Sequence, residues 1–306
     1  GCTHALIVEG NENSSIPRSA HLIGLEQSHP QIGINGKDFY PDLLDKLKDQ
    51  ATAQLVVHNE VLEGIVLPHD LWLKSQAPEA IIPAGKQMKE LGMYPERFPL
   101  ERFVSKEKRD FFRLLLKLTG LSYGNTSMRA LGEEAAYGKF WMSESGVKKD
   151  DLQPHQIRLA RGLIPGTNKM GTVKLSGVPQ TPTGRISVDV IEAEQIYDGC
   201  ENVNVTSHGH VWINDPETGR PLELFTSYRE IDGMYVVCTE RQYPCGSFNL
   251  GQEAMAAASR SPDPTRTIIL ERRHGLVVLA ENYGEMFKRI RSLYKQGFMT
   301  SNIPQD

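Results

Sequence analysis

Val203-Asn204-Val205-Thr206-Ser207-His208-Gly209-His210 is a short apolar strand pattern that ends in two histidines separated by one glycine. Successive side chains of a strand point to opposite faces, so His208 and His210 share a face and can converge on one point. Two such imidazoles supply half of a tetrahedral zinc site. The pair alone is more typical of polar surface or hydrogen-bonded core histidines. A metal site therefore requires a third ligand from elsewhere in the chain.

His274 is the candidate for that third ligand. It lies between two expected strands, over 267–270 and 276–280, and the following Gly275 permits a close backbone approach. Asp189, near the start of a helix expected over 188–197, is placed to supply a carboxylate as ligand or base. The other histidines are expected to be ordinary surface or core residues: His4, His21, His29, His58, His69 and His155.

Helical and extended patterns alternate after residue 103, which predicts an α/β or α+β layered fold. Further helices are expected over 105–120, 250–258 and 286–294, and further strands over 139–142 and 203–206. Residues 1–100 look irregular, with one helix over 41–50 and short strands over 53–58 and 62–67. Because prolines interrupt the chain from 68 to 99, we expect a domain boundary near residues 100–103.

Composition excludes several classes of protein. Of 306 residues, 39% are hydrophobic and 24% charged, and 34 Lys and Arg against 38 Asp and Glu give a net charge of −4. This excludes a generally basic nucleic-acid binder. The longest apolar run, 275–280, is far below the roughly 18 residues of a membrane span.

The four cysteines show no CxxC spacing and are expected to be free thiols of a cytoplasmic protein. The N-terminus, which begins at Gly1, shows no signal-peptide pattern.

Five short segments, in order, give the chain a resemblance to the class II aldolase/adducin-type family, which includes fuculose-phosphate aldolase and ribulose-phosphate 4-epimerase. The segments extend over about residues 105–300. They are Gly124-Asn125-Thr126-Ser127-Met128-Arg129, Lys139–Val147 with Leu152-Gln153-Pro154, Val203–His210, Tyr243–Ser247 with the helix Leu250–Ala258, and Ile268–Val278. The resemblance implies a three-layer α/β/α domain over 103–300 with a central, mainly antiparallel sheet. Residues 1–100 then form an N-terminal extension of unknown fold and function.

The resemblance also implies roles for individual residues. His208, His210 and His274 would be the ligands of a divalent metal, with zinc as the first choice and Mn, Co or Fe as alternatives. Asp189 matches the proton-transfer residue, which is usually Glu in the aldolases and Asp in the epimerases. The substrate- or phosphate-binding positions would be Gly124, Asn125, Ser145, Gly146 and Ser187. Val188 replaces one serine of the family's Ser-Ser pair, which weakens the case for a phosphorylated substrate.

The function that this pattern favours is a metal-dependent aldolase-type lyase. It would cleave or form a C–C bond of a hydroxy-carbonyl or keto-acid substrate through a metal-stabilised enediolate. The alternatives are a sugar-phosphate epimerase, a decarboxylase, or an adducin-like binding module without turnover. The expected partner is a small molecule, and family resemblance implies a closed homo-oligomer, a tetramer, with active sites between neighbouring subunits.

Overall fold

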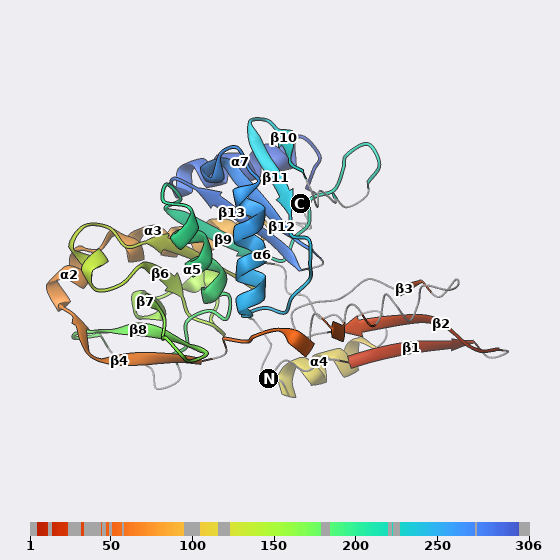
Figure 1. Ribbon diagram of the computed structural model, residues 1–306, viewed down its shortest axis with the longest axis horizontal. Helices are drawn as coiled ribbons and strands as arrows, with labels where there is room; N and C mark the ends of the chain where they lie inside the picture. Colours follow the sequence, from red (N-terminus) through yellow and green to blue (C-terminus); the bar gives the residue numbers. More distant parts are fainter. Residues whose placement is uncertain are drawn as a thin grey trace.

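The computed structural model contains a large sheet covered by helices and a separate three-stranded sheet (Figure 1). The small sheet has the order β1-β2-β3, formed by β1 (Ala5–Asn11), β2 (Ser14–Ile23) and β3 (Ile32–Gly33). The structure describes residues 5–11, 14–23, 32–33, 44, 47–48, 51–56, 58–94, 105–115, 123–178, 184–219, 222, 227–272 and 274–299. None of the helices in this part of the chain is long and apolar enough to cross a lipid bilayer.

The large sheet has ten strands. In spatial order they are β10 (Arg229–Ile231), β11 (Met234–Cys238), β12 (Thr267–Glu271), β13 (Gly275–Ala280), β9 (Val205–Gly209), β5 (Gly124–Arg129), β6 (Phe140–Ser143), β7 (Ile157–Leu163), β8 (Lys169–Leu175) and β4 (His58–Leu67). Only the β11–β12 and β4–β8 pairs are parallel. The expected mainly antiparallel central sheet is therefore confirmed.

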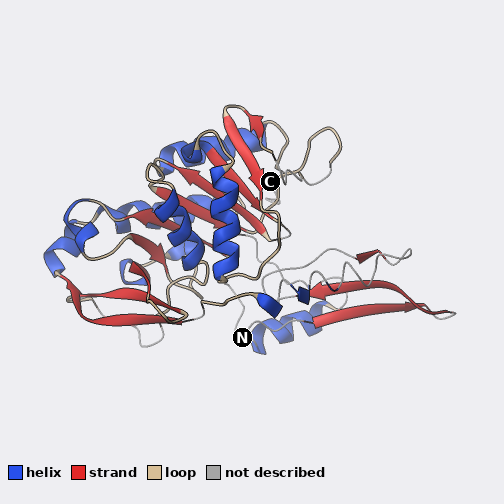
Figure 2. Cartoon of the chain, viewed as in Figure 1, coloured by secondary structure: helices blue, strands red, loops and turns tan. Residues whose placement is uncertain are grey.

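Helices cover both faces of this sheet (Figure 2). The helices of the described residues are α2 (His69–Lys74), α3 (Gln76–Glu90), α4 (Lys106–Leu115), α5 (Val190–Gly199), α6 (Phe248–Ser259) and α7 (Tyr283–Lys295). Short 3-10 turns are η1 (Gly132–Ala136), η2 (Lys149–Asp151), η3 (Pro154–Gln156) and η4 (Pro264–Arg266). Helices α5 and α6 share one core cluster, and α3 and α7 share another. The result is the expected three-layer α/β/α arrangement.

Strand alternation separates these two cores. In β12, Ile269 packs with α5 and α6, whereas Ile268 and Leu270 pack with α3 and α7. In β13, Val277 and Leu279 face the first core, and Leu276 and Val278 face the second. Because both faces of the central strands are buried, these strands are continuous apolar runs in the sequence.

The structure corrects the expectation of an irregular region from 68 to 99. Helix α3 occupies much of it, with Ser75 as N-cap accepting from the amide of Ala77 at 3.2 Å. Pro78 lies in the first turn, where backbone N–H groups have no partner within the helix, so its missing donor is harmless. Pro83 lies inside α3, which shows that tertiary packing overrides the proline signal here.

Strand β4 and helix α3 come before the expected boundary. Strand β4 pairs with β8 at the edge of the large sheet, and α3 contributes Ala84 and Met88 to the core on one face of that sheet. The domain division near residues 100–103 stays a prediction. The strand expected over 62–67 is part of a longer strand, β4, which begins at His58. Of the strand expected over 53–58, the described residues 53–56 form only an isolated bridge, from Leu55 to Ser247.

The remaining expected elements mostly agree with the structure. The expected helices over 188–197, 250–258 and 286–294 correspond to α5, α6 and α7, with ends shifted by a few residues. Helix α4 covers the first part of 105–120, and the end expected at Gly120 lies outside the described residues. Of the helix expected over 41–50, the described residues 44, 47 and 48 are helical. Strand β8 has no counterpart among the expected strands.

Candidate functional site

Three histidines meet at one end of the central strands. His208 is on β9 and pairs in register with Asn125 of β5 and Val277 of β13. Since Val277 faces α5 and α6, the row that contains His208 lies on that face of the sheet. His210 follows one residue after β9 ends, and His274 lies in the β12–β13 hairpin. All three are at most 5% exposed.

The three imidazoles are close enough to hold one metal ion. Their ring centroids are 4.6 to 4.9 Å apart, and one nitrogen of each lies within 4.8 Å of the others. The Nε2 atoms of His210 and His274 are 3.2 Å apart. Two nitrogens bound to zinc at tetrahedral angles would be about 3.3 Å apart. The donor set therefore fits a divalent metal, and the identity of the metal belongs to the proposals below.

Gly275 explains how His274 reaches this cluster. A Cβ atom on Gly275 would lie 2.3 Å from the carbonyl oxygen of Gly209 and 3.1 Å from the Cα of His210. Any side chain would push the β12–β13 hairpin away from β9. The close approach expected from the His-Gly dipeptide is thus a property of this structure.

Asp189 is the N-cap residue of α5 and bonds to Asn125, the register neighbour of His208 on β5. Its side chain makes no cap bond. Instead, Asp189 Oδ2 accepts a 2.8 Å hydrogen bond from Asn125 Nδ2, and Oδ1 has no hydrogen-bond partner among the described residues. Because Asp189 is 5% exposed, this carboxylate keeps one buried oxygen available for another group.

Two further buried carboxylates, from Glu271 and Glu192, lie against the histidines. Glu271 Oε2 is 3.0 Å from His274 Nδ1 and 3.3 Å from His208 Nδ1. Burial and the carboxylates of Glu271 and Asp189 raise the pKa of Glu192 well above its ordinary value. Burial also opposes ionisation of Glu271, but His274 and its other hydrogen-bonding neighbours hold the pKa of Glu271 well below its usual range. These opposite directions favour the proton on Glu192 rather than on Glu271.

Sequence reasoning missed both of these residues. Glu271 directly follows the apolar run Ile268-Ile269-Leu270 and precedes His274 by three positions, so an acid at a strand end beside a candidate ligand is a visible signal. Glu192 has no such signal, because only the packing of α5 shows which of its residues face the sheet.

Cys245 also lies at the cluster. Its Sγ atom is 2.8 Å from Nε2 of His274, and the ring of Tyr123 stacks on His210 with centroids 6.1 Å apart. The expectation of free thiols holds for Cys200, Cys238 and Cys245, while Cys2 lies outside the described residues. A thiol and a phenol ring therefore border the histidine cluster in addition to the carboxyl groups.

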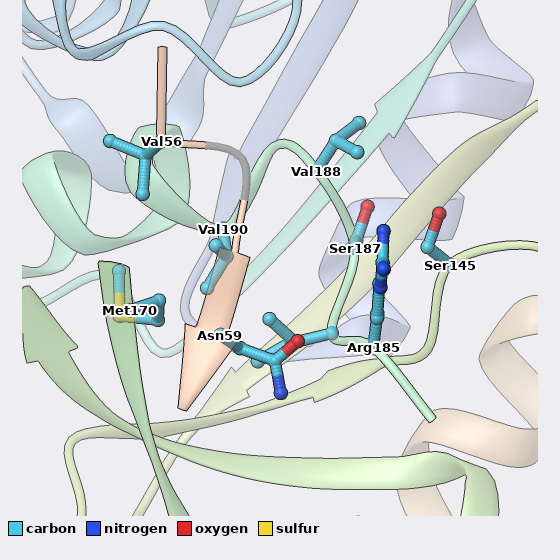
Figure 3. A pocket seen from close by; sticks show the side chains of 9 residues that line it. Val56, Asn59, Ser145, Met170, Arg185, Ser187, Val188 and Val190 are labelled. Carbon is cyan, nitrogen blue, oxygen red and sulfur yellow. The ribbon is translucent and has the colours of Figure 1, made fainter. Parts of the chain in front are cut away.

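A cavity of about 90 Å³ lies beside Ser187, two residues before Asp189. Figure 3 shows that the side chain of Arg185 extends alongside the hydroxyl groups of Ser145 and Ser187. Val56, Val190 and Met170 form much of the remaining wall. A guanidinium and two hydroxyls in one small cavity suit an anion. Arg185 is not among the residues that the sequence places at the site.

The other residues expected to bind substrate lie elsewhere. Asn125 bonds to Asp189, as described above. Gly124 begins β5 rather than a loop, and a Cβ there would lie 2.5 Å from both the carbonyl oxygen of His208 and the ring of Tyr94. Its φ of +128° fits only glycine comfortably. Gly146 follows Ser145 in the expected turn, with φ of +71°.

Lys149 is a buried cation near this turn. Its Nζ donates to the carbonyl oxygen of Glu144, and the carboxylate of Glu144 pairs with the buried guanidinium of Arg158. Burial lowers the pKa of Lys149 to about 7, although Glu144 and Asp189 act in the opposite direction. The turn that presents Ser145 thus rests on a lysine whose charge changes near neutral pH.

Comparisons with known proteins agree with this architecture. Residues 109–295 match the family described as Class II Aldolase and Adducin N-terminal domain. No curated protein sequence matches the chain significantly.

Among solved structures, the chain is similar to L-fuculose-1-phosphate aldolase from Thermus thermophilus, with 15% identity, a TM-score of 0.40, and 71% of this chain and 91% of that chain covered. It is also similar to sugar-phosphate aldolase from Thermotoga maritima, with 13% identity, a TM-score of 0.42, and 70% and 92% covered. A third structure is the N-terminal Class II Aldolase domain of a conserved protein from Thermoplasma acidophilum, with 15% identity, a TM-score of 0.40, and 72% and 92% covered. The family match extends over more than half of the 306 residues, and the chain therefore belongs to the class II aldolase and adducin family.

Proposed function

We propose that this protein is a metal-dependent aldolase-type lyase that cleaves or forms a C–C bond of a hydroxy-carbonyl or keto-acid substrate. One observation carries the proposal. Three buried imidazoles converge within 4.8 Å, and Asn125, the register neighbour of His208, binds the buried carboxylate of Asp189, which has one oxygen free of hydrogen bonds among the described residues. A Lewis acid beside a proton carrier is the combination that enediolate chemistry needs.

His208, His210 and His274 would hold the ion through their imidazole nitrogens. Zinc suits three imidazoles best, and Mn, Co or Fe are alternatives. When bound, a divalent metal would supply the positive charge that stabilises negative charge developing on substrate oxygens.

Asp189 would take up and return the proton. Asn125 Nδ2 holds Asp189 Oδ2 at 2.8 Å, which restricts rotation of the carboxylate and leaves Oδ1 to face the substrate. Asn125 thus acts as a positioning residue for Asp189, a role different from the direct anion contact implied by the family resemblance. A shorter Asp in place of Glu is compatible with this role, because a substrate or water can bridge the remaining gap.

The acidic group of the substrate would lie at Arg185, Ser145 and Ser187. Val188 lacks the hydroxyl of the family's second serine, and Arg185 would supply a positive charge in its place. A guanidinium binds a carboxylate or a phosphate with two parallel hydrogen bonds. We expect Arg185→Met to raise KM for an acidic substrate by at least about tenfold with a smaller change in kcat. An unchanged KM would place the acidic group elsewhere.

A substrate screen tests the proposed reaction. Short hydroxy-ketones and 2-keto acids, with and without phosphate, are incubated with the zinc-loaded protein and with Asp189→Asn. Aldol cleavage releases an aldehyde, epimerisation changes only the stereochemistry, and decarboxylation releases CO₂, so the products separate the three reactions. The absence of turnover on every substrate would favour a binding module instead.

We also propose that the protein forms a closed homo-oligomer, most simply a tetramer, in a cytoplasmic setting. Light scattering at micromolar concentration tests the assembly, and a strict monomer would contradict it. Active sites shared between subunits would further predict that activity falls on dilution below the dissociation constant of the assembly.

A further inference from the structure

Glu271 has a position that the proposed reaction does not explain. It ends β12 on the buried face of the hairpin, with none of its surface exposed to solvent. Burying a carboxylate without a functional partner is strongly unfavourable. Yet Glu271 makes its closest contacts with two imidazoles that are candidate metal ligands, and a second buried acid, Glu192, packs against it.

These contacts involve one oxygen of Glu271 and the same nitrogen, Nδ1, of both rings. A single oxygen, Oε2, approaches Nδ1 of His274 at 3.0 Å and Nδ1 of His208 at 3.3 Å. Both contacts are ion-pair distances rather than hydrogen bonds of full geometry. A carboxylate oxygen accepts hydrogen bonds, so a proton on each Nδ1 is the arrangement that would make both contacts favourable. In the neutral ring, the other nitrogen, Nε2, is then unprotonated. In His274 it can accept from the thiol of Cys245, 2.8 Å away in this structure, or ligate a metal. Nε2 of His274 is also the nitrogen that lies 3.2 Å from Nε2 of His210.

We propose that Glu271 is a positioning residue that fixes His208 and His274 in the Nδ1–H tautomer and directs their Nε2 atoms to a common divalent ion. Glu192 supports Glu271 from α5. A carboxylate that binds the far nitrogen of a metal-ligating histidine orients the ring and strengthens the ligand. Here one carboxylate serves two ligands at once. This inference rests on the proposed metal site.

Zinc affinity, measured by competition with a chelating dye, is the first test. We expect Glu271→Gln to weaken Zn²⁺ binding by about 10–100-fold, because the amide no longer accepts from both rings. Glu271→Leu, which also removes the buried charge, should bind zinc at least as weakly. Glu194→Gln is the matched control. Glu194, on α5, is a buried carboxylate like Glu271, but it bonds to Lys139 and the amide of Leu163 instead of to histidines. Equal zinc affinity in wild type and both Glu271 variants would overturn the inference.

A cobalt spectrum separates positioning from direct ligation. If Glu271 only orients the rings, Co²⁺-saturated Glu271→Gln keeps the d–d band positions and intensities of the wild type. A shifted spectrum would mean that Glu271 is itself a ligand, as the alternative donor group of Glu192, His208 and Glu271 would allow, and would also overturn the inference.

Nitrogen NMR of ¹⁵N-histidine-labelled protein reads the tautomers directly, with or without zinc. We expect Nδ1–H for His208 and His274 in the wild type and loss of this preference in Glu271→Leu. Nε2–H in the metal-free wild type would refute the inference. A wild type that binds no zinc but shows the Nδ1–H tautomers would instead refute the proposed function and leave the tautomer assignment standing.

Discussion

The two faces of the sheet at strands β5 and β9 use buried polar groups in different ways. On the face covered by α3 and α7, the hydroxyls of Thr126 and Ser207 lie 2.7 Å apart, and Thr126 donates to Tyr283. On the face covered by α5, the hydroxyls of Ser127, Thr206 and Tyr197 form a similar group. Only this second face continues into the Asn125–Asp189 pair and His208.

This difference indicates which polar residues hold the fold together and which serve chemistry. Hydroxyls that satisfy one another are stable in a core without any ligand. A buried carboxylate with an oxygen that lacks a hydrogen-bond partner among the described residues, such as Asp189, is unfavourable unless something else binds there. We therefore expect substitutions in the two groups of paired hydroxyls to lower stability, and substitutions of Asp189 or the three histidines to remove metal or activity.

The largest effect is expected for His274→Ala. Removing one of three ligands should abolish stable metal binding and turnover, because two imidazoles cannot complete the site. Ser207→Ala, on β9 beside His208 but on the opposite face of the sheet, is the control and should retain metal and activity. Metal content after gel filtration and turnover are measured for both. Full metal content in His274→Ala would remove His274 from the ligand set.

Asp189→Asn is expected to lower turnover by roughly 10²–10⁴, the usual contribution of a general acid or base. Metal content should stay near that of wild type, because Asp189 is assigned to proton transfer. A parallel loss of metal affinity would make Asp189 a ligand. Full activity in this variant would mean that another residue is the base.

Tyr283→Phe tests the opposite face. The phenol accepts from Thr126 and donates to the carbonyl of Ser127 at 2.9 Å, so its removal leaves buried polar groups with fewer partners. We expect a loss of about 1–2 kcal/mol in the free energy of unfolding, with metal content and kcat unchanged. Urea denaturation measures the stability, and elemental analysis measures the metal content. A loss of metal in this variant would break the proposed division between the paired hydroxyls and the site residues.

The smallest effect is a pH dependence caused by Lys149. Burial lowers its pKa to about 7 in the folded protein, so between pH 7 and the ordinary lysine pKa the unfolded chain binds more protons. Its contribution to stability therefore increases as pH rises from about 7 to 9. Lys149→Met should flatten this increase in urea midpoints measured across that range. An identical slope in the variant would show that Lys149 is not the titrating group.

Much of the layered domain could be predicted because its central strands are buried on both faces and its helices are amphipathic. Residues 267–270 and 276–280 are continuous apolar runs, and α7 buries Met286, Phe287, Ile290 and Leu293 at helical spacing. Helix α3 escapes prediction because Pro78 and Pro83 conceal a buried stripe that includes Ile81, Ala84 and Met88. Strand β4, at the half-exposed edge of the sheet, is predicted over 62–67, but its first residues, from His58, are not.

The candidate site is predictable only in part, for a related reason. The His-Gly-His strand and the His-Gly hairpin carry local patterns that point to a ligand set. Glu192 and Arg185 have no such local pattern, because their roles depend on which side of α5 and of the preceding segment faces the sheet. Family resemblance assigns Asn125 to the substrate, whereas its side chain bonds to Asp189, a contact between residues far apart in sequence.

The metal content of the purified wild-type protein tests the central claim most directly. The protein is purified without chelators, supplied with excess Zn²⁺, gel-filtered and measured by elemental analysis beside His208→Ala, His210→Ala and His274→Ala. The account predicts about one zinc per chain in the wild type and less than about a tenth of that in each variant. A wild type without metal, or variants that retain it, would contradict the claim that these three histidines form a metal centre.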